Sequence, residues 1–356
     1  MKEVLIRHIR AYPAMTVTDA VKLCYQSAFG GGHLITDEAR ALAFLHTERK
    51  QLLQSAETPL TEEIGGGVVR LNLAASQAAT LSDAHILRAF AASAAHIAKR
   101  TDNDARFHAA LDALRALASE GAAPFTLDAL DAYLTQYRAN GCPPVSHSPE
   151  YRAQNAPAYR VMGAEFAALL PLLGRIDALL SANMGRCVTV AIDGYAAAGK
   201  STCAAALSAM YDSCIFHMDD YFLPPQRRTP ERLSVPGGNV DHERFSAEIL
   251  TAILAQKPAL HSAFDCQSGT LLPPKTTALR PLVIVEGSYS HHPKLSAAWN
   301  LRIAIDVEAQ TQRDRIRCRN GPQMLRLFEE RWIPMEHHYF QALRIFENAD
   351  AVIRVP

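Results

Sequence analysis

The feature that most constrains this chain is an apolar segment, residues 187–192, followed one residue later by Gly194-Tyr-Ala-Ala-Ala-Gly-Lys-Ser201. The β-branched residues of the segment predict a buried strand, and the alanine-rich residues 202–210 predict a helix. Two glycines between them let the backbone curl so that several N–H groups point at one anion, which the start of the helix also attracts. Strand, glycine loop and helix stand in the order that a polyphosphate-binding loop requires, whereas an ordinary turn needs no such order.

The side chains of this loop match the pattern G-x-x-x-x-G-K-[ST]. Lys200 is positioned to reach the β- and γ-phosphates of a nucleotide, and the Ser201 hydroxyl is positioned to ligate Mg²⁺. The chain contains no [NT]-K-x-D sequence for reading guanine, so we expect ATP and Mg²⁺ as cofactors. The loop residues expected to contact the nucleotide are Gly194, Ala196, Ala197, Ala198, Gly199, Lys200, Ser201 and Thr202.

Composition limits the remaining possibilities. A length of 356 residues suggests two domains, and a hydrophobic content of 49% is sufficient for two cores. Lys+Arg and Asp+Glu balance at 36 each, so no global charge indicates a nucleic-acid or anionic-membrane partner. The scattered cysteines include no C-x-x-C pair, and the sequence lacks a signal-peptide pattern and any long apolar run. We expect a soluble, cytoplasmic protein.

The chain divides into regions of different character. Residues 1–160 carry apolar residues at helical spacing and predict a mainly α-helical domain, with one short strand at 68–73. Residues 161–184 predict a connecting helix or linker. From 185 to 356 strands and helices alternate, which predicts a parallel sheet flanked by helices on both faces. The expected strands of this second domain are 187–192, 214–218, 282–286, 301–307 and 351–355.

Two of these strands end in carboxylates, and ligands of such sheets gather at the carboxyl ends of the strands. The strand 282–286 ends in Glu286, which is expected to order Mg²⁺ together with Ser201. The strand 214–218 runs into Asp219 and Asp220, either of which could act as a base. We favour Asp219.

Taken together, these motifs resemble the uridine kinase and phosphoribulokinase-like branch of the P-loop kinases over residues 187–356. Besides the glycine loop, the likeness includes Asp219–Phe222, Asn239-Val-Asp241-His242, Phe264-Asp265, Val285-Glu286-Gly287 and the arginine-dense segment 313–319. The resemblance implies an α/β P-loop kinase domain with a five-stranded parallel sheet and a lid, preceded here by the helical domain.

The resemblance also implies roles for individual residues. Asp219 would accept a proton from the attacking hydroxyl, and Asp241 would hydrogen-bond sugar hydroxyls. Arg315 and Arg319 fall on the lid arginines of the family, and arginine forks suit phosphate oxygens. Arg317, between them, is an additional candidate for contact with the nucleotide. The remaining residues implied at the substrate site are Tyr221, Phe264 and Asp265.

The sequence departs from the family where uridine kinases read the pyrimidine ring. Phe264 stands at the place of a tyrosine, and Cys266-Gln-Ser-Gly269 supplies no histidine. A site without those hydrogen-bonding groups loses its discrimination for one ring. We therefore expect transfer of the γ-phosphoryl of ATP to a hydroxyl of a small sugar-bearing or polyol metabolite, and the residues do not identify the acceptor.

Some features carry no assigned role. The glycine triplets at 30–32 and 65–67, with His33 and Arg70 after them, favour turns over anion-binding loops. The aromatic and basic residues Tyr151, Arg152, Tyr159 and Arg160 precede the linker. An ATP-binding regulator whose P-loop domain controls the helical domain stays open as the alternative function, and a homodimer stays open as the oligomeric state.

Overall fold

The computed structural model describes residues 1–35, 37–266 and 268–355. The chain forms two compact units, Met1–Pro171 and Leu172–Pro356. The helix α9 (Ala164–Ala182), which contains Pro171, carries the chain from the first unit into the second. Among the described residues, no helix is long and apolar enough to cross a membrane.

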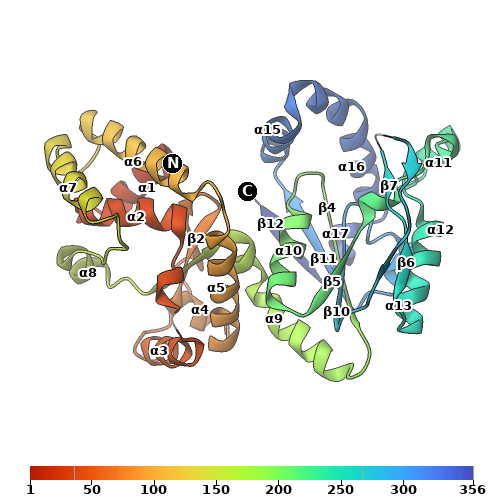
Figure 1. The fold of residues 1–356 in the computed structure, drawn as a ribbon, viewed down its shortest axis with the longest axis horizontal. Coiled ribbons are helices and arrows are strands. Elements are labelled where there is room, and N and C mark those ends of the chain that lie inside the picture. Colours follow the sequence, from red (N-terminus) through yellow and green to blue (C-terminus); the bar gives the residue numbers. More distant parts are fainter. Residues whose placement is uncertain (36, 267, 356) are drawn as a thin grey trace. The chain divides into compact units, whose positions relative to one another are not determined.

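The second unit is built on a five-stranded parallel sheet, seen in Figure 1 with helices on both of its sides. The strand order is β12-β11-β4-β10-β5, and every neighbouring pair is parallel. This topology confirms the predicted α/β fold class. The strands are β4 (Val188–Gly194), β5 (Ser213–His217), β10 (Leu282–Glu286), β11 (Leu301–Val307) and β12 (Ala351–Val355).

Burial on both faces explains why the central strands are nearly continuous apolar runs. All residues of β4 and β10 are buried. Helix α10 (Lys200–Met210) packs against β4, β5 and β10. The hydrophobic core of this unit includes Ala191, Val283 and Val285 of the sheet. They pack with aromatic side chains, among them Phe245, Tyr339 and Phe340.

Shorter elements surround this sheet. Two small antiparallel ribbons pair β6 (Ala259–His261) with β9 (Lys275–Thr277) and β7 (Phe264–Asp265) with β8 (Thr270–Leu271). The helix α15 (Ala309–Leu327) has a kink at Gly321, which has a φ of 81° and precedes Pro322. The other helices are α11 (Pro230–Ser234), α12 (His242–Phe245), α13 (Thr251–Ala255), α14 (Pro293–Ser296), α16 (Ile333–Ala342) and α17 (Ile345–Asn348).

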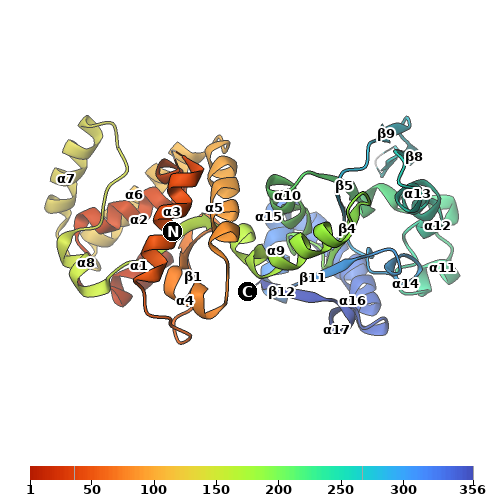
Figure 2. The ribbon, with the colours of Figure 1, turned by 90° about the horizontal axis from the view of Figure 1, so that it is seen from below.

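The first unit combines helices with a three-stranded antiparallel sheet in the order β1-β2-β3. The strands are β1 (Thr61–Gly65), β2 (Val68–Asn72) and β3 (Tyr159–Gly163), and β2 was the one expected from the sequence. The helices, viewed from a second direction in Figure 2, are α1 (Lys2–Ala11), α2 (Val17–Phe29), α3 (Glu38–Lys50), α4 (Leu73–Ala78), α5 (Asp83–Ala98), α6 (Asn103–Ser119), α7 (Leu127–Ala139) and α8 (Pro149–Asn155).

The glycine triplet 65–67 forms the turn between β1 and β2. Gly66 has a φ of 65°, and a Cβ at this position would lie 2.6 Å from the carbonyl oxygen of Ser27 in α2. Glycine is therefore required both by the left-handed backbone and by the close approach of the helix. The turn predicted from the sequence is the structure observed.

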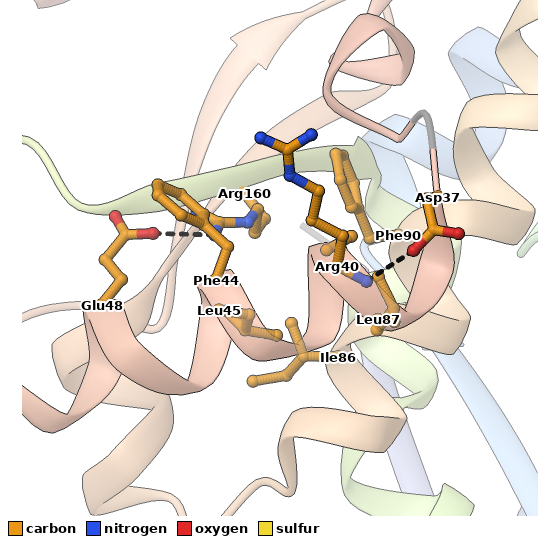
Figure 3. Close-up of a pocket in the computed structure, with 10 residues that line it drawn as sticks. Asp37, Arg40, Phe44, Leu45, Glu48, Ile86, Leu87, Phe90 and Arg160 are labelled. Carbon is orange, nitrogen blue, oxygen red and sulfur yellow. Dashed lines mark hydrogen bonds and ion pairs between the residues drawn. The ribbon is translucent and has the colours of Figure 1, made fainter.

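A pocket of about 210 Å³ opens between α3, α5 and β3 in the first unit, and Figure 3 shows the residues that line it. Its apolar lining includes Leu45, Ile86 and Phe90. At its rim, Arg160 of β3 donates a hydrogen bond of 2.7 Å to Glu48. The pocket thus lies on the Arg160 face of the three-stranded sheet.

Candidate active site

The glycine loop lies between β4 and α10, where the predicted strand-loop-helix order is observed. Gly194 has a φ of 156°, and a Cβ there would lie 2.5 Å from the carbonyl oxygen of Ile305. The Lys200 ammonium donates hydrogen bonds of 2.9 Å to the carbonyl oxygens of Gly194 and Tyr195. These contacts hold the Lys200 side chain over the loop, beside the backbone amides at the start of α10.

A buried carboxylate that the sequence analysis missed organises this loop from behind. Asp193, the residue between the predicted strand and Gly194, is fully buried. It accepts hydrogen bonds from the backbone N–H groups of Gly194, Tyr289 and His291 and from the Tyr339 hydroxyl, at 2.8–3.1 Å. Asp193 therefore joins the glycine loop to the loop after β10. The sequence could have pointed to Asp193, because it stands at the carboxyl end of a predicted buried strand, where the functional residues of such sheets gather.

The structure brings Ser201 and Glu286, the two residues expected to order Mg²⁺, into contact. The Ser201 hydroxyl donates a 3.1 Å hydrogen bond to Glu286 Oε2, while His217 Nδ1 lies 2.6 Å from Glu286 Oε1. The parallel register explains the meeting, because Glu286 pairs with Ile192 of β4 and with His217 of β5. The hydrogen bond to Glu286 is the main cause that raises the pKa of His217 above its ordinary value.

The side-chain oxygens of Ser201 and Glu286 are suitable ligands for a magnesium ion. Mg²⁺ prefers oxygen ligands, and in nucleotide sites it takes one or two protein oxygens while phosphates and waters complete its shell. Among the described residues there is no group of three or more His, Cys, Asp or Glu side chains that could hold a metal by itself. A hydroxyl next to a carboxylate at the end of the glycine loop is suited to a magnesium ion that arrives with a nucleotide.

Asp219 and Asp220 follow β5 in a short 3-10 turn, Met218–Tyr221. Solvent reaches Asp219, yet the protein around it removes enough water for desolvation to raise the pKa of its carboxyl. The positive charge of Lys200 opposes this rise, and the negative charge of Glu286 adds to it. Asp219 thus shares one electrostatic environment with the lysine of the glycine loop and with Glu286.

Two residues implied at the substrate site are already bonded within the protein. Asp241 is buried, forms an ion pair with Arg227 and accepts a 3.1 Å hydrogen bond from the Arg244 N–H at the start of α12. Tyr221 is fully buried and donates a 3.1 Å hydrogen bond to Glu248. Contact of either side chain with a substrate would require these bonds to be exchanged, so both roles stay predictions.

Phe264 and Asp265 form the short strand β7, which packs against the turn that holds Asp219. Phe264 is buried, whereas Asp265 is partly exposed and accepts a 3.2 Å hydrogen bond from the Ser268 N–H. In the segment 266–269, where the sequence analysis found no histidine, Gln267 lies outside the described residues. The substrate-site roles of Phe264 and Asp265 stay predictions.

The arginines of α15 differ in their distance from the loop. Arg315 donates hydrogen bonds to the carbonyl oxygens of Ala197 and Ala198, at 3.1 and 3.4 Å. Arg317 is exposed and pairs with Asp314 at 2.5 Å, and Arg319 is exposed and donates to Asn320 at 2.7 Å. Arg315 therefore lies on the glycine loop itself, whereas Arg317 and Arg319 bond to side chains of their own helix.

Glu336 of α16 is a second residue that the sequence analysis did not assign to the site. Its Oε2 accepts a 2.9 Å hydrogen bond from the Ala196 N–H of the glycine loop, and its Oε1 accepts a 3.0 Å bond from Ser288. Burial is the main cause that raises the pKa of Glu336. A buried carboxylate thus occupies a backbone donor of the predicted phosphate-binding loop. Its local sequence gave no signal of this contact.

The sheet order, the glycine loop and the strand-end carboxylates define the second unit as an α/β domain of the P-loop type. No family model matches the chain, and no curated protein matches it. Solved structures of other proteins do resemble about half of it. One, from Bacillus stearothermophilus, is described as a possible uridine kinase; it is 19% identical and covers 51% of this chain and 98% of its own, with a TM-score of 0.37.

Two further structures show likenesses of the same order. A protein from Silicibacter sp. TM1040, provisionally described as a fructose transport system kinase, is 22% identical over 51% of this chain and 96% of its own, with a TM-score of 0.42. TT1252 from Thermus thermophilus is 17% identical and covers 48% of this chain and 90% of its own, with a TM-score of 0.26. The functional argument therefore rests on the geometry of the site.

Proposed function

We propose that the second unit is an ATP- and Mg²⁺-dependent kinase that transfers the γ-phosphoryl group to a hydroxyl of a small molecule. The observation that carries this proposal is the convergence of Lys200, the Ser201–Glu286 pair and Asp219 at the carboxyl ends of adjacent strands. A loop that only bound a nucleotide would need the first two features. The carboxylate after β5 adds a base beside them.

The side chains divide the work of phosphoryl transfer, which depends on positioning and charge more than on covalent help. Lys200 and Arg315 supply positive charge next to the loop, where the phosphate oxygens would lie. A magnesium ion, held by Ser201 with Glu286 behind it, would neutralise charge between the β- and γ-phosphates. Asp219 takes the proton of the acceptor hydroxyl as its oxygen attacks, and the raised pKa of this carboxyl favours that step.

The proposed acceptor is a molecule that the protein recognises without hydrogen bonds to one particular ring. Phe264 provides an apolar surface at the place where the resembling family has a tyrosine, and it is buried. Polar groups nearby include both charges, since Arg228 lies close to Asp265 and Arg227 is paired with Asp241. We infer a polyol or sugar-bearing metabolite, read through its hydroxyls.

The experiment that tests the proposal is ADP release from Mg·ATP across a panel of nucleosides, sugars and vitamin alcohols. Turnover with one acceptor, lost in Lys200→Ala and Asp219→Asn, is the expected result. Nucleotide binding measured by calorimetry without turnover on any acceptor would favour the alternative, an ATP-binding regulator of the first unit, and would remove the kinase assignment.

A further inference from the structure

The first unit contains a second group of buried polar side chains, away from the pocket of Figure 3. Arg160 of β3 lines that pocket, and the adjacent residue Tyr159 points to the opposite face of the sheet because side chains alternate along a strand. Arg70, Tyr151 and Tyr159, to which the sequence assigned no role, all belong to this group.

The centre of the group is a chain of three titratable side chains. Asp19 of α2 is fully buried, and His147 donates a 2.7 Å hydrogen bond from Nδ1 to its Oδ1. His147 Nε2 lies 2.5 Å from the Tyr159 hydroxyl. The Tyr151 ring stacks on the imidazole, with ring centroids 4.2 Å apart and planes 5° from parallel. The imidazole is therefore fixed in orientation between a carboxylate and a phenol.

Hydrogen bonds assign the protonation states of this chain. Burial opposes the charged form of Asp19, but hydrogen bonds from His147, Ser148 and Thr16 outweigh it and hold the pKa of this carboxyl below its usual range. Burial also lowers the pKa of His147, against the raising effect of the bond to Asp19, and this lowering favours the neutral ring. A neutral ring with its proton on Nδ1 leaves Nε2 as an acceptor for the Tyr159 proton, which is the arrangement of a base oriented by a carboxylate.

Tyr159 has a cation over its ring that would stabilise a phenolate. The guanidinium carbon of the buried Arg70 lies 4.6 Å from the ring centroid. Gln26 holds Arg70 there, since its Oε1 accepts a 3.0 Å bond from the guanidinium. Burial raises the pKa of Tyr159 and the charge of Arg70 opposes that rise, so the phenol is neutral at rest and its anion is partly compensated.

A lysine of α2 lies next to this chain, together with two arginines. Lys22 follows Asp19 by three residues in α2, so the two side chains lie on the same side of the helix. Its ammonium donates a 2.6 Å bond to the carbonyl oxygen of Val145, and the nearby carboxylate of Asp19 acts on it through its charge. Burial, together with the charges of Arg70 and Arg152, lowers the pKa of Lys22 to about 8, and the charge of Asp19 opposes this shift. The positive charges of Lys22, Arg70 and Arg152 together attract an anion.

A purely bracing role explains only part of the arrangement. The bonds from Thr16 and Ser148 to Asp19 cap α2 and fix the segment before α8. These two contacts are explained by a role in stability alone. A brace requires neither a phenol at the far nitrogen of the histidine nor a cluster of three cations beside it. Partly buried groups of like charge are costly and are typical of functional sites.

We propose that Asp19, His147 and Tyr159 form an acid–base relay that acts on a small oxyanion-bearing molecule bound by Lys22. In this relay the proton of the ligand passes to the Tyr159 oxygen while the tyrosine's own proton passes to His147 Nε2. Asp19 balances the charge of the resulting imidazolium, and the reverse transfer returns both protons. The site is separate from the glycine loop and does not depend on the kinase assignment.

The test measures the reactivity of Tyr159 in the full chain with N-acetylimidazole, followed by mass spectrometry of each tyrosine peptide. The Tyr159 oxygen attacks the acetyl group as His147 removes the phenolic proton, the acetyl–nitrogen bond breaks, and imidazole leaves with a proton taken up from solvent. Tyr133, a partly exposed tyrosine of α7, is the internal reference. We expect Tyr159 to react faster than Tyr133 although it is part of a buried network, and acetate or inorganic phosphate to slow its reaction.

Two variants complete the test, with Lys50→Met, an exposed lysine of α3, as the matched control. His147→Gln should slow acetylation of Tyr159 by about tenfold or more while leaving Tyr133 unchanged, as expected on removal of a general base. Lys22→Met should keep the reactivity but abolish protection by the anions, and the extent of protection by phosphate against acetate identifies the preferred oxyanion.

Two outcomes would overturn the proposal. One is a Tyr159 that reacts no faster than Tyr133, or equally fast in His147→Gln, because a bracing tyrosine behaves in that way. The other is an absence of protection by both anions in the unaltered chain. Since Lys22→Met leaves the bonds of Asp19 in place, it supplies a result even if His147→Gln fails to fold.

Discussion

Replacing Glu336 with glutamine should strengthen ATP binding. The carboxylate of Glu336 accepts a hydrogen bond from the Ala196 N–H, 2.9 Å away, on the loop proposed to hold the phosphates. Glutamine has the same shape, and its oxygen can accept the bond from Ala196. Its NH2 group then faces the Ser288 hydroxyl, which can accept a hydrogen bond instead of donating one, so the substitution chiefly removes a charge. Without that charge, an incoming polyphosphate meets less repulsion at the loop.

The magnitude follows from the distance. A phosphate oxygen bound to the neighbouring amides would lie about 3 Å beyond the Ala196 nitrogen, hence about 6 Å from the carboxylate. At an effective dielectric constant of about 20, two unit charges at that separation repel by about 3 kcal/mol. The raised pKa of Glu336 makes protonation on binding easier, which reduces the net cost to about 2 kcal/mol. We therefore expect the Kd for ATP to fall by roughly thirtyfold.

The assay is calorimetry with Mg·ATP on the unaltered chain, on Glu336→Gln and on Glu330→Gln. Glu330 is an exposed glutamate of the segment before α16 and serves as the matched control for a change of one charge. A gain in affinity confined to Glu336→Gln is the expected result. Equal or weaker binding by a Glu336→Gln variant with an unchanged melting temperature would refute the reasoning, because the carboxylate would then be no obstacle to the nucleotide.

The remaining predictions concern the loop and the acids around it. Lys200→Ala should lower kcat by about 10²–10³, measured as ADP release, because one preorganised charge is lost; unchanged turnover would contradict its role. Asp219→Asn should lower kcat by about 10² with ATP affinity kept, whereas a dead Asp220→Asn beside an active Asp219→Asn would move the base by one residue. The bond to Glu286 raises the pKa of His217, so its stabilisation is present at low pH and is lost as the pH rises through the folded pKa. In denaturant unfolding, His217→Gln should therefore cost more stability at about pH 5.5 than at about pH 8.5, and equal costs would contradict the coupling.

The local order of the sequence determined most of the second unit. The apolar runs around 188–194, 282–286 and 301–307 are buried on both faces in the sheet, so their composition alone indicated central parallel strands. The glycine loop could be recognised because its backbone requirement is local: Gly194 leaves no room for a Cβ beside Ile305. Ser201 meets Glu286 because parallel strands end at the same edge of a sheet, while their role as magnesium ligands stays a prediction.

The sequence identified less of the first unit. Its β1 and β3 are short strands of five residues, and β3 pairs with β2 from the far end of the unit, so their pairing leaves little mark on local periodicity. The relay could not be recognised from the sequence either. Asp19 and His147 lie 128 residues apart and meet only when α2 and the segment before α8 pack together.

What the sequence by itself determined is therefore the class of the second unit and the loop that would hold a nucleotide, since both depend on residues close together in the chain. Tertiary structure alone decided which polar groups surround that loop. Glu336 reaches Ala196 across 140 residues, and the carboxyl of Asp241 is occupied by Arg227. Whether a buried carboxylate is free or bonded depends on which side chains pack against it, and packing is set by the whole fold.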